Sequence, residues 1–151
     1  MTRAFVVLLT LCNCALQAQQ QPLVGEWRIS YAGGMRIEDG VATPIMATGT
    51  LTIEAKADSL VANLVTEPAP DLPARPPVRV VTRAGAGDAT FTAHTKATIN
   101  INGAEREATV VSTWVLRAKG DSLEGTVQRK VEGFEGGSQE PQPVTGTRRR
   151  G

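Results

Sequence analysis

The stretch FTAHTKATINI at residues 91–101, followed by Asn102-Gly103, decides the fold class of this chain. Small and apolar residues occupy every second position and polar residues the others, which is the period of a β-strand with one buried face. Asn-Gly is the strongest short hairpin signal, because both residues accept a positive φ. With these two residues as the loop, Phe91 faces Trp114, and the apolar faces of the two segments coincide over the whole hairpin.

Segments with the same period recur along the chain after residue 20, rich in Thr, Val and Ile and separated by Gly, Asp, Asn and Pro. No sustained helical period appears among them. We therefore expect an all-β fold, a single antiparallel up-and-down β-barrel of about eight strands, whose closure removes exposed sheet edges. Such a barrel encloses just enough room for side chains or one small ligand. The predicted strands are residues 23–32, 46–54, 59–66, 78–83, 89–101, 104–117, 122–132 and 142–149.

The next turn of the chain is predicted at residues 118–121. A four-residue turn there pairs Leu116 with Leu123 across the hairpin. Trp114 then faces Gly125, where the indole would cover the missing side chain.

The sequence around this turn occurs twice. Residues 55–60 read AKADSL and residues 118–123 read AKGDSL. We interpret the pair as one hairpin solution used twice, with an internal duplication as the alternative. Transferring the register to the first copy sets Ile53 opposite Leu60.

The N-terminus has the pattern of a secretory signal peptide. Residues 1–3 carry one positive charge, residues 4–11 are apolar, and Ala18 supplies a small residue before a polar stretch. The apolar run is shorter than the roughly 20 residues that span a bilayer. We therefore expect cleavage after Ala18 and export of one domain, residues 19–151, to the periplasm or beyond the cell. A buried N-terminal strand or helix is the alternative.

Both cysteines, Cys12 and Cys14, lie in the predicted leader, and lipidation at one of them is a further alternative. The exported domain would then have no disulfide, reactive thiolate or cysteine-ligated metal. Removing Arg3 leaves 15 basic residues, equal to the 15 acidic ones. This balance predicts neither a nucleic acid nor an anionic membrane as partner. The cluster at residues 148–150 is read as a solvated end, with an anion contact as the alternative.

Residues 68–77 read PAPDLPARPP. Proline cannot donate to a β-ladder, so this segment must be an ordered loop or a flexible flap.

A short motif, Gly25-Glu26-Trp27, stands at the start of the first predicted strand. With an eight-strand meander, an export signal and an arginine in the last strand, it resembles the lipocalin-like (calycin) β-barrels, and small exported bacterial members more than animal carriers. The resemblance covers the architecture of residues 19–151, but lacks the family's usual disulfide. It implies that Trp27 closes one barrel end beneath Arg148. It also implies binding of a small, often apolar molecule, although some members are enzymes or inhibitors.

The sequence shows no catalytic or metal-binding constellation. His94 is the only histidine, and it faces outward on the predicted register, which argues against a metal or haem ligand. Ser112 faces inward, but no acid or histidine is placed to activate it. We expect no cofactor.

Two arginines fall on the inward face. Arg129 could hold a ligand carboxylate, and Arg106 is a second candidate for the same role. The alternative is that a strand bulge turns both arginines outward, or that both sit at the wet mouth of the barrel. Several inward residues, including Gly49, Ala62 and Gly125, are small and leave room for a cavity. The candidate ligand-binding residues are Trp27, Tyr31, Phe91, Trp114 and Arg129.

The sequence therefore predicts a monomeric, non-catalytic barrel that binds a small hydrophobic or amphipathic molecule, without membrane insertion. One alternative is a filled barrel that acts as a structural or protein-interaction module. Another is an enzyme of isomerase or cyclase type. A cavity of about 300 Å³ or more favours the carrier, and a close-packed interior favours the filled module.

Overall fold

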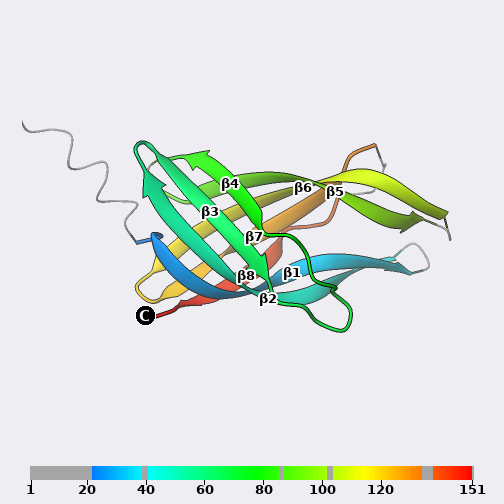
Figure 1. The fold of residues 1–151 in the computed structure, drawn as a ribbon, viewed down its shortest axis with the longest axis horizontal. Coiled ribbons are helices and arrows are strands. Elements are labelled where there is room, and N and C mark those ends of the chain that lie inside the picture. Colours follow the sequence, from blue (N-terminus) through cyan, green and yellow to red (C-terminus); the bar gives the residue numbers. More distant parts are fainter. Residues whose placement is uncertain (1–21, 39–40, 86, 102–103, 134–137, 151) are drawn as a thin grey trace, which may run out of the picture.

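A computed structural model describes residues 22–38, 41–85, 87–101, 104–133 and 138–150; the predicted signal peptide lies outside these ranges. The fold is all-β, and eight antiparallel strands form a nearly closed barrel, as predicted (Figure 1). No described residues form a helix long and apolar enough to cross a membrane. The strands are β1 (Gly25–Glu38), β2 (Val41–Lys56), β3 (Ser59–Thr66), β4 (Val78–Arg83), β5 (Ala89–Ile101), β6 (Ala104–Lys119), β7 (Ser122–Val131) and β8 (Gln142–Arg148).

The sheet consists of two four-strand meanders, in the order β4-β3-β2-β1-β8-β7-β6-β5. Within the described residues, only the β1–β8 ladder joins them by strand pairing, from Trp27↔Arg148 to Ser30↔Thr145. At the other side of the barrel, β4 and β5 lie near each other but share no ladder. We call this unpaired boundary the β4–β5 seam.

Two long hairpins extend beyond the barrel body, β1–β2 and β5–β6 (Figure 1). The β5–β6 register is the predicted one, with Phe91 opposite Trp114, although Asn102 and Gly103 lie outside the described residues. The predicted strands 23–32 and 46–54 are too short. A β-bulge between Ala32 and Gly34 shifts the register, so that pairing continues past the two glycines that interrupt the period-2 pattern.

The repeated hairpin is confirmed, but its predicted register is wrong by two residues. Leu116 faces Gly125 rather than Leu123, and Ile53 faces Ala62 rather than Leu60. Each loop has two residues instead of four. A shift of two residues leaves every side chain on its predicted face, so the inward assignments stand.

Positive φ angles explain the tighter loops. Ala57 adopts φ 53° and Gly120 adopts φ 59° at the first loop position, so Lys56 pairs with Ser59 as Lys119 pairs with Ser122. The strands before the two turns, β2 and β6, both have 16 residues. The similarity between the two meanders therefore extends beyond the repeated six residues.

The small inward residues do not leave the expected space. A Cβ at Gly125 would collide with the Val115 carbonyl oxygen and crowd Leu116 Cδ2, so these groups rather than Trp114 cover this glycine. Leu64 Cδ1 occupies the corresponding space at Gly49. Close approach of neighbours fills these positions, and the interior packs around one apolar core. Its largest fully buried side chains are Trp27, Ile29, Ile53, Leu60, Leu72, Phe91, Leu116, Leu123, Val127 and Val144.

The Pro-rich segment is an ordered loop fastened to the barrel. Leu72 is only 1% exposed, and its methyl groups lie where Gly33 and Gly34 lack a side chain. Ala69 and Leu72 exchange two backbone hydrogen bonds of 2.8 and 2.9 Å. Arg75 Nη1 donates to the Gly33 carbonyl oxygen at 2.7 Å. Through Leu72, the loop that joins β3 to β4 (Figure 1) therefore belongs to the hydrophobic core.

The strained loop residue yields a stability prediction. Ala57→Gly should raise the free energy of unfolding by about 0.5–1 kcal/mol, because glycine adopts a positive φ without a Cβ clash. Urea unfolding followed by tryptophan fluorescence measures this change. Gly120→Ala is the matched control and should lower stability by a similar amount, because alanine disfavours the φ of 59° at this position. Open space surrounds Gly120, so the added methyl group makes no clash that would enlarge the effect. Destabilisation by Ala57→Gly would contradict this account.

Candidate functional site

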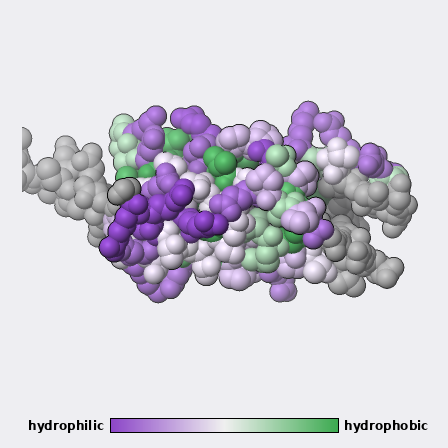
Figure 2. Space-filling model, turned by 60° about the horizontal axis from the view of Figure 1, so that its bottom comes forward, coloured by the Kyte–Doolittle hydropathy of each residue, from purple (hydrophilic) through white to green (hydrophobic). Residues whose placement is uncertain are grey.

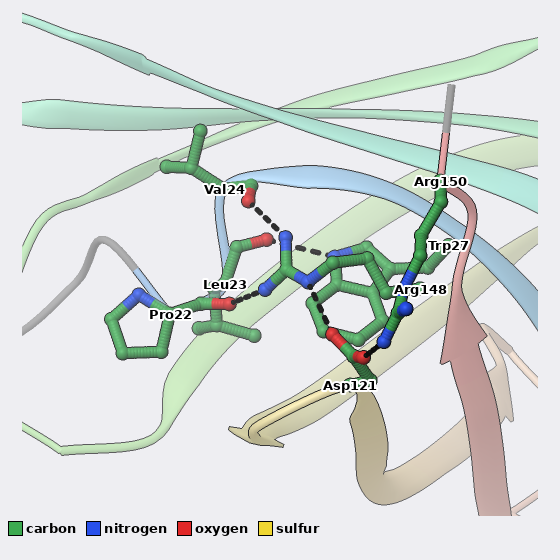
Figure 3. Close-up of polar contacts among 7 residues, drawn as sticks. All are labelled: Pro22, Leu23, Val24, Trp27, Asp121, Arg148 and Arg150. Atoms are coloured by element: carbon green, nitrogen blue, oxygen red, sulfur yellow. Dashed lines mark hydrogen bonds and ion pairs between the residues drawn. The ribbon is translucent and has the colours of Figure 1, made fainter.

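Arg148 covers Trp27 where β1 begins and β8 ends (Figure 3), and we call this the closed end of the barrel. Trp27 is fully buried, and its Nε1 donates to the Leu23 carbonyl oxygen at 2.9 Å. The Arg148 guanidinium lies over the indole, 4.1 Å from the ring centroid. It donates to the carbonyl oxygens of Val24 at 2.7 Å and Pro22 at 2.5 Å. The predicted packing of Arg148 over Trp27 is thus present.

Gly25 makes this arrangement sterically possible. A Cβ at this position would collide with the Arg148 guanidinium, and the backbone φ of 139° further disfavours other residues. In the Gly-x-Trp motif, the glycine therefore leaves room for the Arg148 guanidinium, and the tryptophan provides the ring on which it packs.

Charged groups surround this closed end. Asp121, in the β6–β7 turn, forms ion pairs with Arg148 and Arg150 (Figure 3). The Arg150 hydrogen bond and charge hold the pKa of Asp121 below its usual value. Arg149 pairs with Glu26 at 3.0 Å. Strongly hydrophilic surface gathers near the C-terminus in the space-filling view (Figure 2). All three arginines of the C-terminal cluster, residues 148–150, therefore form ion pairs with carboxylates of the barrel.

Farther along the barrel lies an apolar layer with a small cavity. Tyr31 and Trp114 pack with ring centroids 5.0 Å apart and an interplanar angle of 58°. Trp114 and Phe91 face each other across the β5–β6 ladder. Both line an apolar cavity of about 20 Å³ that is partly open to solvent. This volume holds about one water molecule, far below the roughly 300–1,000 Å³ of ordinary ligand pockets.

The cavity lies beside the β4–β5 seam. Val78 and Val80 of β4 line it on one side of the seam, and Phe91 of β5 lines it on the other. Because no ladder joins these strands, their separation would break no strand-to-strand hydrogen bonds of a β-ladder.

Arg129 lies inside the barrel one layer beyond the aromatic residues. It is only 9% exposed, and it donates to the backbone oxygen of Ala32 across the interior. Among the described residues, no carboxylate forms an ion pair with it. Burial lowers the pKa of Arg129 to about 10, opposed by nearby Tyr31 and assisted by the positive charge of Arg75. At neutral pH it is therefore a buried cation that no carboxylate of the described residues neutralises.

Gln139 was not singled out by the sequence. It lies in the segment leading into β8, is 7% exposed, and donates its backbone N–H to the Arg129 carbonyl oxygen at 2.8 Å. Its side-chain Nε2 and Oε1 are both buried without a hydrogen-bond partner among the described residues. Such a group is costly to leave unsatisfied. No sequence signal marks Gln139, because two nearby prolines obscure its pairing.

The structure brings four of the five predicted site residues into adjoining layers of the interior. Tyr31 contacts Trp114, Trp114 faces Phe91, and Arg129 follows Trp114 by one layer. Trp27 lies apart, at the closed end beneath Arg148.

The structure places the other residues considered from the sequence in different environments. Ser112 is buried between Ala93 and Arg129 on neighbouring strands. His94 faces outward and is exposed. Arg106 is also exposed, on the β5–β6 hairpin beyond the barrel body, so it does not join Arg129 in the interior. Among the described residues, no three His, Cys, Asp or Glu side chains are grouped to hold a metal ion.

No protein-family model, curated protein or solved structure matches this chain. The arguments about function therefore rest on the geometry of the barrel interior.

The buried Arg129 and the partly exposed Arg148 should respond oppositely to mutation. Arg129→Met should raise the free energy of unfolding by about 1–2 kcal/mol, because an apolar side chain replaces an unpaired buried charge. Arg148→Met should lower it by about 1–3 kcal/mol, because two carbonyl hydrogen bonds and the indole contact are lost. Urea unfolding at pH 7 measures both. If Arg129→Met is the more destabilising change, the bond to Ala32 is structural and Arg129 is not a strained site.

Proposed function

We propose that this protein is an exported, monomeric and non-catalytic barrel that binds a small amphipathic molecule with an acidic end. The observation that carries the proposal is the buried Arg129 guanidinium, which has no carboxylate partner among the described residues. A filled structural barrel gains nothing from this charge, whereas a ligand carboxylate would pair with it bidentately.

The apolar part of the ligand would enter the aromatic layer next to Arg129. Phe91, Trp114 and Val80 offer an apolar wall there, and the cavity between them reaches the β4–β5 seam. The 20 Å³ cavity must widen to admit a chain. Separation of β4 from β5 can supply that space without breaking a ladder, and burial of each CH₂ contributes about 0.8 kcal/mol.

The resemblance to lipocalin-like barrels supports the same proposal. The nearly closed eight-strand meander and the packing of Arg148 over Trp27 are both features that the resemblance implied. The leader pattern at residues 1–18 supports export.

The filled barrel remains the second candidate, and the small cavity is the observation that favours it. In that case the surfaces of the barrel, or the Pro-rich loop at residues 68–77, would carry the interaction. The two candidates differ in whether any amphiphile enters the interior.

Three ten-carbon amphiphiles test the proposal. Decanoate should bind at least about tenfold more tightly than decanol, because a charge-assisted hydrogen bond contributes roughly 1.5–3 kcal/mol, and decylammonium should not bind. Isothermal titration calorimetry and native mass spectrometry measure the affinities. Arg129→Met should make decanoate and decanol equivalent. Arg79→Met, an exposed arginine on β4, is the matched control and should preserve the preference.

Two further results show whether the ligand enters the cavity and whether the carrier proposal holds at all. Ala62→Val narrows the cavity and should weaken binding of both decanoate and decanol without changing their ratio. Absence of binding by all three amphiphiles to the folded protein would reject the carrier and leave the filled barrel.

Export has its own test. Expression of residues 1–151 in a bacterial host should yield protein outside the cytoplasm whose intact mass begins at Gln19. Replacing residues 6–9 with charged residues should abolish both export and cleavage. Uncleaved protein in the cytoplasm would contradict this part of the proposal, and a lipid-modified mass beginning at Cys12 or Cys14 would replace it with the lipoprotein alternative.

A further inference from the structure

Arg129 and Gln139 are cross-strand neighbours. Lys130 pairs with Ser138 as an isolated bridge, and the Gln139 N–H donates to the Arg129 carbonyl oxygen. The register therefore places Arg129 directly opposite Gln139, and directly opposed residues of an antiparallel pair project from the same face, with Cβ atoms about 4.5–5.5 Å apart. Lys130 and Ser138 are exposed, whereas Arg129 and Gln139 are both buried, as this alternation requires.

These neighbours leave a complementary set of polar groups unsatisfied. Among the described residues, the guanidinium makes one hydrogen bond, to Ala32, and no ion pair. The carboxamide presents both a donor, Nε2, and an acceptor, Oε1, without partners in the described part of the chain. A carboxylate satisfies the guanidinium and Nε2, but it cannot donate to Oε1. A ligand group that carries a hydroxyl or similar donor beside its carboxylate would complete the set.

We propose that Arg129 and Gln139 form a head-group subsite for a hydroxycarboxylate, whose hydroxyl lies close to its carboxylate on an otherwise apolar chain. This inference rests on the proposed ligand-binding function and specifies its ligand class. The carboxylate accepts from the Arg129 guanidinium and from Gln139 Nε2, and the hydroxyl donates to Gln139 Oε1. The apolar chain extends toward Trp114 and Phe91, one layer away.

The test compares decanoate with 3-hydroxydecanoate by isothermal titration calorimetry. The added hydroxyl should strengthen binding about tenfold, because it satisfies a buried acceptor that decanoate leaves unpaired. Moving the hydroxyl to the far end, in 10-hydroxydecanoate, should weaken binding relative to decanoate, since it would enter the apolar layer.

Four variants locate the effect. Gln139→Met should reduce the preference for 3-hydroxydecanoate to about unity, while Arg129→Met should remove the advantage of decanoate over decanol. Gln128→Met, an exposed glutamine on the same strand as Arg129, should leave both preferences unchanged. Gln139→Glu places a carboxylate opposite Arg129 and should abolish decanoate binding while raising the melting temperature.

The outcomes separate this inference from the function on which it rests. Equal affinity for decanoate and 3-hydroxydecanoate in the unmodified protein overturns the hydroxycarboxylate subsite but keeps the acidic-amphiphile carrier. A hydroxyl preference that persists in Gln139→Met also overturns it, because the hydroxyl is then recognised elsewhere. Failure of both compounds to bind the folded protein rejects the proposed function itself.

Discussion

The contact of Arg148 with Trp27 is the constraint on which this barrel depends. The two meanders are joined by strand pairing only through the short β1–β8 ladder of the described residues, and that ladder begins at the Trp27–Arg148 pair. The guanidinium adds carbonyl hydrogen bonds to Pro22 and Val24 and an ion pair to Asp121 (Figure 3). One side chain thus ties the last strand to the first strand, to the segment that precedes it and to a distant turn.

The barrel holds two arginines in opposite situations, the partly exposed Arg148 and the buried Arg129. Arg148 has three polar partners and an aromatic face, so its charge stabilises the junction. Arg129 donates to a single carbonyl oxygen among the described residues, and its burial lowers its pKa to about 10. Gln139 adds two more unsatisfied atoms at the same place. Within the described residues, the well-paired arginine and the unsatisfied buried polar groups therefore lie in different parts of one barrel.

The alternation of apolar and polar residues along the strands, together with the residues at the turns, was enough to predict the fold class, the β5–β6 register and the inward face of Arg129. They failed at the hairpin after Lys56, because a positive φ at an alanine is not visible in its residue type. They also failed at Gly33, where a bulge lets a strand continue through a break in its pattern.

The candidate site was predicted only in part. Trp114 and Arg129 follow from alternation along single strands, which the sequence displays directly. Gln139 depends on the pairing of an irregular segment beside prolines, and its missing partners can be recognised only when every neighbouring strand is in place. Long-range packing likewise decides the burial of Leu72. Its Pro-rich surroundings in the sequence give no sign that it belongs to the core.

The β4–β5 seam has a consequence for the connectivity of the chain. The described chain begins and ends at the β1–β8 junction, where Arg148 contacts Pro22, whereas the seam is crossed by the covalent link between Arg83 and Ala89 but by no ladder. The eight strands therefore form a ring with two different gaps. Between β8 and β1 the strands are paired but not joined by a loop, whereas between β4 and β5 they are joined by a loop but not paired. A circular permutant that joins the ends by a short linker and opens between Arg83 and Ala89 would run from β5 to β4 and retain every ladder. In such a chain the two gaps would coincide, and the halves that share the AKADSL and AKGDSL turns would exchange their order.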